Sequence, residues 1–205
     1  MIWVKEIQGN PRMLLPSSPR FGSLDRQRRP ARRGVATLWT ILMIPAVLCL
    51  LALILEVGNL WLARVELANA MEAAALAGAD VWGDTGNIAN ARAAAVTYAA
   101  QNTVIGVPVV VGANGGGTVN NTTCNGSVVI LGRTNAAAPY TFDANIAPVG
   151  GQLEAVRVQA TVSVTSVIGT LFGNILGPWN ITAQASAVYT GGAPQLINVA
   201  VYNCP

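Results

Sequence analysis

The stretch that decides the fold is RRGVATLWTILMIPAVLCLLALILEVG, residues 32–58. Two arginines begin it, 21 uncharged residues follow from Val35 to Leu55, and Glu56 is the next charged residue. As an α-helix, a run of this length rises ~31 Å, which matches the ~30 Å hydrocarbon core of a bilayer. The run is apolar on every side, unlike a helix that packs one face on a soluble core. We therefore predict a transmembrane helix over residues 34–55.

A cleavable secretion signal is the main alternative for such a run. Secretion signals have a shorter apolar core, and a small-residue cleavage site lies directly behind it. Here the run is followed by EVGNLWLARVEL, and the nearest small-residue stretch, Ala77–Ala79, lies more than 20 residues further on. The sequence therefore predicts an uncleaved signal-anchor.

Charge is divided unequally between the two sides of this run. Residues 1–33 contain eight basic and two acidic residues, a net charge of +6, whereas residues 34–205 contain four basic and seven acidic residues, a net charge of −3. A basic cluster lies directly before the run: Arg26, Arg28, Arg29, Arg32 and Arg33. The positive-inside rule then places the N-terminus in the cytoplasm and residues 56–205 outside. We expect a single-pass protein of the cytoplasmic (inner) membrane whose first 33 residues form a disordered basic tail.

The basic cluster is also compatible with nucleic-acid binding. It has no interleaved aromatic residues and belongs to no folded basic domain, both of which a nucleic-acid-binding segment usually has. Topogenic charge next to acidic lipid headgroups accounts for it. The membrane is therefore an expected partner, and nucleic acid is not.

Past the membrane the helix is expected to continue along a stripe of small and apolar residues. The stripe recurs at steps of three and four and includes a candidate partner-helix face: Ala63, Leu67, Ala70, Ala74 and Gly78. Small residues on such a face let another helix approach closely, but they suit a core-facing helix equally well. The helix should end near Gly83–Gly86, and a second helix should follow over residues 87–102 with Asn87 as its N-cap.

From residue 104 onward the pattern becomes typical of β-strands. VIGVPVVV and SVVILGR are short apolar runs, and EAVRVQATVSV and NITAQASAVY alternate between two faces. The glycine-broken segment SVIGTLFGNILGPW between them indicates a loop or a short helical turn. The predicted fold class is therefore α+β. A long membrane helix continues into an extracytoplasmic helix, a second helix follows, and a small, mainly antiparallel sheet completes one domain over residues 56–205.

The segment from Arg32 to Asp80 resembles the N-terminal signature of the TadE/TadG-like proteins of the tight-adherence (Flp) pilus machinery. A basic pair and a glycine precede an apolar span, the span ends in Glu-Val-Gly, and an Ala-rich AAALAGA follows. Later blocks recur in the same order up to Tyr189, which favours the TadG-like branch. The resemblance implies a membrane-anchored structural or assembly component of a Tad/Flp-type pilus or secretion system, minor pseudopilin-like or TadG-like. It implies other Tad/Flp pilus assembly proteins as partners, and self-association through the small-residue helix.

The chain departs from the family pattern at two places. TadE-like pseudopilins have a glutamate five residues after the processing glycine, where this chain has Trp39 after Gly34. Trimming after Gly34 is therefore not expected. Some TadG-like members also have a von Willebrand-type domain with a D-x-S-x-S metal motif, and none of Asp80, Asp84 and Asp143 begins such a motif.

No residue pattern in the chain predicts catalysis. Histidine is absent, which removes the usual general base and most zinc sites. The acidic residues beyond the membrane run are scattered, and GANGGG is not followed by the Lys-Ser/Thr of a phosphate loop. We expect no catalytic residue, no cofactor and no metal, and hence no enzyme.

The three cysteines differ in their predicted compartment. Cys49 lies in the membrane run, where a free thiol behaves as a small apolar group. Cys124 and Cys204 both lie on the extracytoplasmic side, where a disulfide can persist. The sequence therefore allows a Cys124–Cys204 bridge, with two unpaired thiols as the alternative.

A rival function shares only the anchor signature. In that case the chain is a membrane-tethered extracytoplasmic binding module, either an adhesin or an envelope protein. The sequence does not distinguish a role in the filament from one at its base. It leaves open the contacted partner, the stoichiometry and the start codon, Met1 or Met13.

Overall fold

The computed structural model describes residues 33–115, 121–171 and 177–204. The chain divides into two compact units, residues 1–44 and residues 45–205. The described part of the first unit is the start of α1 (Arg33–Thr85), a helix of 53 residues that continues through the second unit. Two further helices, α2 (Ile88–Gln101) and α3 (Val167–Leu171), belong to the second unit.

Helix α1 has an apolar N-terminal part with exposed side chains. From Gly34 to Leu55 every residue is exposed except Ala52, which is half-buried. This is the one helix among the described residues that is long and apolar enough to cross a membrane, and none of its most apolar window is buried in the protein. Its length, composition and exposure fit a transmembrane anchor.

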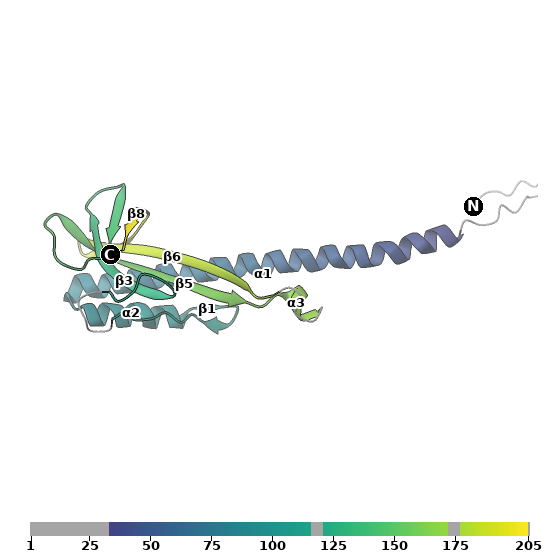
Figure 1. Ribbon diagram of the computed structural model, residues 1–205, viewed down its shortest axis with the longest axis horizontal. Helices are drawn as coiled ribbons and strands as arrows, with labels where there is room; N and C mark the ends of the chain where they lie inside the picture. The colour runs from purple at the N-terminus through teal and green to yellow at the C-terminus, as the bar shows by residue number, and fades with distance from the viewer. Residues whose placement is uncertain (1–32, 116–120, 172–176, 205) are drawn as a thin grey trace, which may run out of the picture. The chain divides into compact units, whose positions relative to one another are not determined.

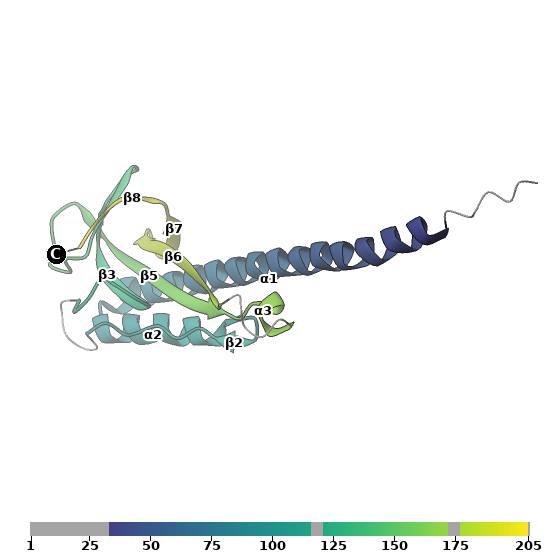
Figure 2. The same ribbon diagram turned by 45° about the vertical axis from the view of Figure 1, so that its right-hand side comes forward.

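The end of α1 and the start of α2 follow the sequence-based prediction. Helix α1 ends at Thr85, and Gly86 has φ +63°, a conformation that glycine adopts without steric cost. The side chain of Asn87 caps α2 by accepting a hydrogen bond from the backbone nitrogen of Asn90 at 3.1 Å. A turn of two residues therefore reverses the chain between the two helices, which lie side by side in Figures 1 and 2.

Six strands form the main sheet in the order β7-β6-β5-β3-β4-β8. Their bounds are β3 Val128–Asn135, β4 Tyr140–Asp143, β5 Gln152–Val164, β6 Trp179–Thr190, β7 Ala193–Ile197 and β8 Val199–Asn203. All neighbouring strands pair antiparallel except β4 and β8, which pair parallel. The longest pairing joins β5 to β6, from Ala155 opposite Val188 to Val164 opposite Trp179. The predicted fold class, α+β with a mainly antiparallel sheet, is confirmed.

One apolar run of the predicted β region contains a chain reversal. The run VIGVPVVV at residues 104–111 begins inside a separate two-stranded hairpin. Strands β1 (Thr103–Val104) and β2 (Val107–Pro108) pair antiparallel around Ile105 and Gly106. Gly106 has φ +76°, which fits a tight turn, so the glycine inside the apolar run marks the reversal.

The main core lies between the helices and one face of the sheet. The inward residues of α1 and α2 pack against alternate residues of β3, β5 and β6, including Val129, Leu131, Val156 and Val158. The other face has a smaller apolar cluster around Phe142, Ile130 and Ala155. The alternation of β5 predicted from its sequence is thus the alternation between these two cores.

Candidate functional site

The candidate site is the junction at which the exposed part of α1 meets the sheet domain. Glu56, the first acidic residue after the apolar run, is only 6% exposed. Its carboxylate accepts hydrogen bonds from the backbone nitrogens of Val167 at 2.8 Å and Ile168 at 3.2 Å, both at the start of α3. It also accepts one from the indole nitrogen of Trp179 at 2.8 Å. A single side chain of α1 therefore holds two segments that lie more than 100 residues further along the chain.

The chemistry of this contact explains why a carboxylate is buried there. A buried carboxylate is costly unless hydrogen-bond donors surround it. Three N–H groups supply the donors, and two of them are amides of the first turn of α3. Such charge-assisted hydrogen bonds are stronger than neutral ones. Glu56 therefore connects α1 to the start of α3 and to the start of β6.

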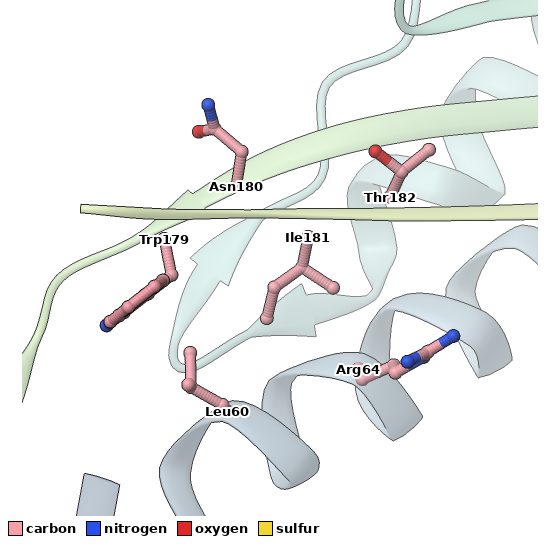
Figure 3. Close-up of a pocket in the computed structure, with 6 residues that line it drawn as sticks. All are labelled: Leu60, Arg64, Trp179, Asn180, Ile181 and Thr182. Carbon is pink, nitrogen blue, oxygen red and sulfur yellow. The ribbon is translucent and has the colours of Figure 1, made fainter. Parts of the chain in front are cut away.

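An open groove of about 420 Å³ lies beside this contact, between α1 and β6. Leu60 and Arg64 line it from α1, and Trp179 to Thr182 line it from β6. Figure 3 shows Trp179 and Ile181 pointing toward α1, whereas Asn180 and Thr182 point to the other side of the strand. The groove is lined equally by apolar residues (Leu60, Trp179, Ile181) and polar ones, and Arg64 is the charged residue in its lining.

A second glutamate of α1 holds another loop in a similar way. The carboxylate of Glu66 accepts a hydrogen bond from the backbone nitrogen of Ile105 at 2.7 Å, at the turn of the β1–β2 hairpin. Ile105 has φ +49°, which is unusual for a β-branched residue. The two glutamates thus attach α3 and the hairpin to the same helix.

The small-residue face of α1 is buried in the protein's own core. Ala63, Leu67, Ala70 and Ala74 have no exposed surface. A Cβ added at Gly78 would lie 3.1 Å from Val156 and 3.2 Å from Ala95. This face therefore contacts the sheet and α2. The protein's own sheet and α2 thus occupy the face that was a candidate for a partner helix, which is the arrangement that the core-facing alternative expects.

The cysteines that the sequence places outside the membrane are adjacent in the structure. Cys124 and Cys204 have Cα atoms 6.2 Å apart and are joined in a disulfide that closes a loop with a sequence separation of 80. Cys49 is free and exposed on α1. The bridge attaches the C-terminal end of the chain to the segment before β3.

The remaining predictions from the sequence concern the basic cluster and metal binding. The basic cluster lies outside the described residues, apart from Arg33 at the start of α1. Within residues 33–115, 121–171 and 177–204, no three His, Cys, Asp or Glu side chains are placed to hold a metal ion.

Arg157, 7% exposed, stacks 4.3 Å over the ring of Tyr202 and donates a hydrogen bond to Gln184. Burial lowers the pKa of Arg157, while interaction with Tyr202 opposes this shift.

Several structural roles were not predicted from the sequence. The polar loop before β3 contains Asn114 and Asn121, which act as hydrogen-bond clamps. Asn121 donates to the backbone oxygens of Leu131 and Ala144, both at 2.7 Å, and accepts from Arg92 at 3.2 Å. Glu56 was visible only as the acid that ends the apolar run. Its position at the end of the apolar run was the available signal.

Comparison with protein-family models gives two matches. A model described as "Putative Flp pilus-assembly TadE/G-like" matches residues 34–81. A model described as "Putative Tad-like Flp pilus-assembly" matches residues 70–188, which is more than half of the 205 residues. Comparisons with curated proteins and with solved structures found no match.

Proposed function

Because the chain belongs to the Flp pilus-assembly family of TadE/G-like and Tad-like proteins, we propose that it is a membrane-anchored structural component of a Tad/Flp-type pilus or secretion system. Its N-terminal tail lies in the cytoplasm, and residues 56–205 form a domain on the other side of the inner membrane. The domain acts through its surface, and its partners are other Tad/Flp assembly proteins.

The observation that carries this proposal is the change of environment along α1. Up to Leu55 the helix presents apolar side chains on all sides, as a helix surrounded by lipid does. From Ala63 onward one face is buried against the sheet. The same helix therefore fits both an anchor and the central support of a folded domain.

Charge supports the proposed orientation. The +6 charge of residues 1–33 precedes the anchor, and the −3 charge of residues 34–205 follows it. Basic residues are retained on the cytoplasmic side of an anchor. The Cys124–Cys204 bridge also fits an oxidising extracytoplasmic compartment.

Topology reporters test the orientation. A reporter that is active only outside the cytoplasm should be active when fused after Asn203 and inactive when fused at Ser23. The opposite pattern would overturn the orientation and the compartment assigned to the domain.

Gene deletion in the native host tests the assembly role. Loss of the protein should remove surface pili, and the complete chain supplied in trans should restore them. A matched chain with Val47 replaced by Arg should fold its domain but fail to restore pili, because a charge near the middle of the apolar run disfavours membrane insertion. Normal piliation in the deletion strain would contradict an assembly role and favour a tethered binding module.

A further inference from the structure

The end of the apolar run fixes the height of the lipid boundary along α1. Residues 45–55 of the helix are uncharged and lead directly into Glu56, and Arg64 is the next charged residue after it. The interfacial layer outside the hydrocarbon core is about 5–8 Å thick on each side. At 1.5 Å rise per residue, that layer covers about one to one and a half helical turns beyond Glu56.

Hydrogen bonds to Glu56 hold the end of the sheet at this same height. The amides of Val167 and Ile168 and the indole nitrogen of Trp179 all lie within 3.2 Å of its carboxylate oxygens. Figures 1 and 2 both show α3 beside α1, beyond the ends of β5 and β6. The start of α3 and the start of β6 are therefore at the level where the apolar run ends.

The residues exposed at this height suit a lipid headgroup layer. Trp179 is 43% exposed although its indole nitrogen is bound, and Trp61, five residues beyond Glu56, is 70% exposed. Val57 and Leu62 are also exposed. Tryptophan is enriched at membrane interfaces because its ring is apolar and its N–H is polar.

Charge at this end of the domain agrees with that environment. Residues 165–171 and 177–184 contain no charged side chain. The carboxylate of Glu56 is buried and bound to three donors, so its negative charge is stabilised within the protein and is not exposed at the surface. Apart from the buried Glu56 and from Arg64 in the adjoining groove, the end of the domain next to its anchor is therefore uncharged and contains tryptophan.

We propose that Trp179, Trp61 and the start of α3 form a lipid-contacting surface, which seats the domain on the membrane, and that Glu56 sets its height. The occupant of this surface is the bilayer interface. The bilayer interface surrounds the helix on all sides. Whether these side chains contact lipid therefore depends on their position along α1, and not on which side of the helix they occupy. This inference rests on the proposed anchoring of α1.

Tryptophan quenching by brominated lipids tests the proposal on the full chain in phosphatidylcholine vesicles. The chain has five tryptophans, and Trp82 is buried in the core about 39 Å along α1 from Glu56. Three matched variants retain Trp82 and replace Trp3 and Trp61 with Phe. The first also retains Trp39 and reports on the anchor, the second also retains Trp179, and the third has Trp82 alone as the background.

Brominated acyl chains should reduce the emission of both the Trp39 and the Trp179 variants relative to the Trp82 background. Quenching of Trp39 without quenching of Trp179 would overturn the seating surface and leave the anchor intact. Absence of quenching in both would overturn the anchor and the inference together. If Trp179 is shielded only after other pilus proteins are added, the occupant is a protein and the lipid proposal is wrong.

The role of Glu56 is tested separately by introducing Glu56→Ala into both the Trp179 variant and the Trp39 variant. Glu56→Ala removes the acceptor for all three hydrogen bonds, so the quenching of Trp179 should decrease while Trp39 quenching stays the same. Glu72→Ala, at an exposed position of the same helix, is the matched control and should leave both unchanged. Unaltered Trp179 quenching in Glu56→Ala would show that Glu56 does not set the height of this surface.

Discussion

Leu53 and Leu67 show how one helix serves two environments. They lie on nearly the same side of α1, because fourteen residues make almost four complete turns. Leu53 is 56% exposed in the protein, whereas Leu67 has no exposed surface. The two residues are chemically identical and belong to one uninterrupted helix. What distinguishes them is the surroundings: the sheet and α2 cover Leu67, and the protein supplies no cover for Leu53.

The composition of the two parts explains the difference. In the first part, large apolar residues occur on every side of the helix, which suits a surrounding apolar solvent. In the second part, small residues such as Ala70 and Ala74 form the inward stripe, and Glu66, Asn69 and Glu72 lie off it. Small inward residues allow the helix to pack closely on the sheet. Matched substitutions in the two parts should therefore have different effects on the domain.

The cysteines provide the largest expected contrast between the two parts. Replacing Cys124 with Ser removes a bridge with a sequence separation of 80, which should cost about 4–5 kcal/mol by the loop-entropy relation. Replacing Cys49 with Ser should leave the unfolding free energy of the domain unchanged, since Cys49 is exposed on α1. Denaturant unfolding in detergent, under non-reducing conditions, measures both. Peptide mapping that finds Cys124 and Cys204 freely alkylated in native membranes would refute the bridge.

Substitutions of the two leucines should differ in unfolding free energy by somewhat less than those of the cysteines. Leu67→Ala deletes a fully buried side chain and should cost about 2–5 kcal/mol of unfolding free energy. Leu53→Ala removes no contact with the domain core and should leave the melting temperature of the domain unchanged. Circular dichroism of both variants in the same detergent gives the comparison. Equal losses of stability would mean that the first part of α1 belongs to the domain core.

The sequence predicts the periodic parts of this fold well. Twenty-one uncharged residues, a glycine-marked helix end and two alternating strands each reflect a local rule, and the structure has a helix or a strand at each of those places. The hairpin around Ile105 was missed because the other residues of the run, apart from Gly106, are five valines and one proline, so the turn lies within an apolar, β-branched run. Periodicity alone does not separate a strand from a tight hairpin of β-branched residues.

The candidate site was much less accessible to sequence reasoning. Small residues at helical spacing suit both a partner helix and the protein's own sheet, and only the tertiary structure distinguishes them. The contact between Glu56 and Trp179 joins residues 123 positions apart, and no local pattern specifies it. The same holds for Asn121, whose amide donates to Leu131 within β3 and to Ala144 directly after β4. Long-range polar contacts depend on the assembled fold.

Two glycines of α1 extend the comparison between its two parts, with a smaller expected effect on stability. A Cβ at Gly83 would overlap the ring of Tyr189, whereas nothing lies within 4 Å of a Cβ at Gly58. Gly83→Ala should therefore cost about 1–3 kcal/mol through overpacking. Gly58→Ala should not lower the stability, because alanine favours a helix by up to about 1 kcal/mol over glycine. Thermal unfolding of the pair measures the contrast, and two equal shifts would contradict the packing of Tyr189 on α1.

The smallest expected effect concerns the same end of α1 and depends on pH. The hydroxyl of Tyr189 donates a hydrogen bond to Asp84 at 2.6 Å. That bond raises the pKa of Tyr189 above its ordinary value, and partial burial and the charges of Asp84 and Asp80 add to the shift. In the unfolded chain tyrosine titrates near pH ~10. The folded state thus holds this proton more tightly, so the bond stabilises it fully below pH ~10 and less as the pH rises through the raised pKa. Tyr189→Phe should lose stability at neutral pH and show a shallower decline above pH ~10 than the parent chain, as measured by melting temperature across the range. If the melting temperatures of both proteins decline in parallel above pH ~10, Tyr189 does not bond Asp84 in solution. The end of α1 would then lack this link to β6.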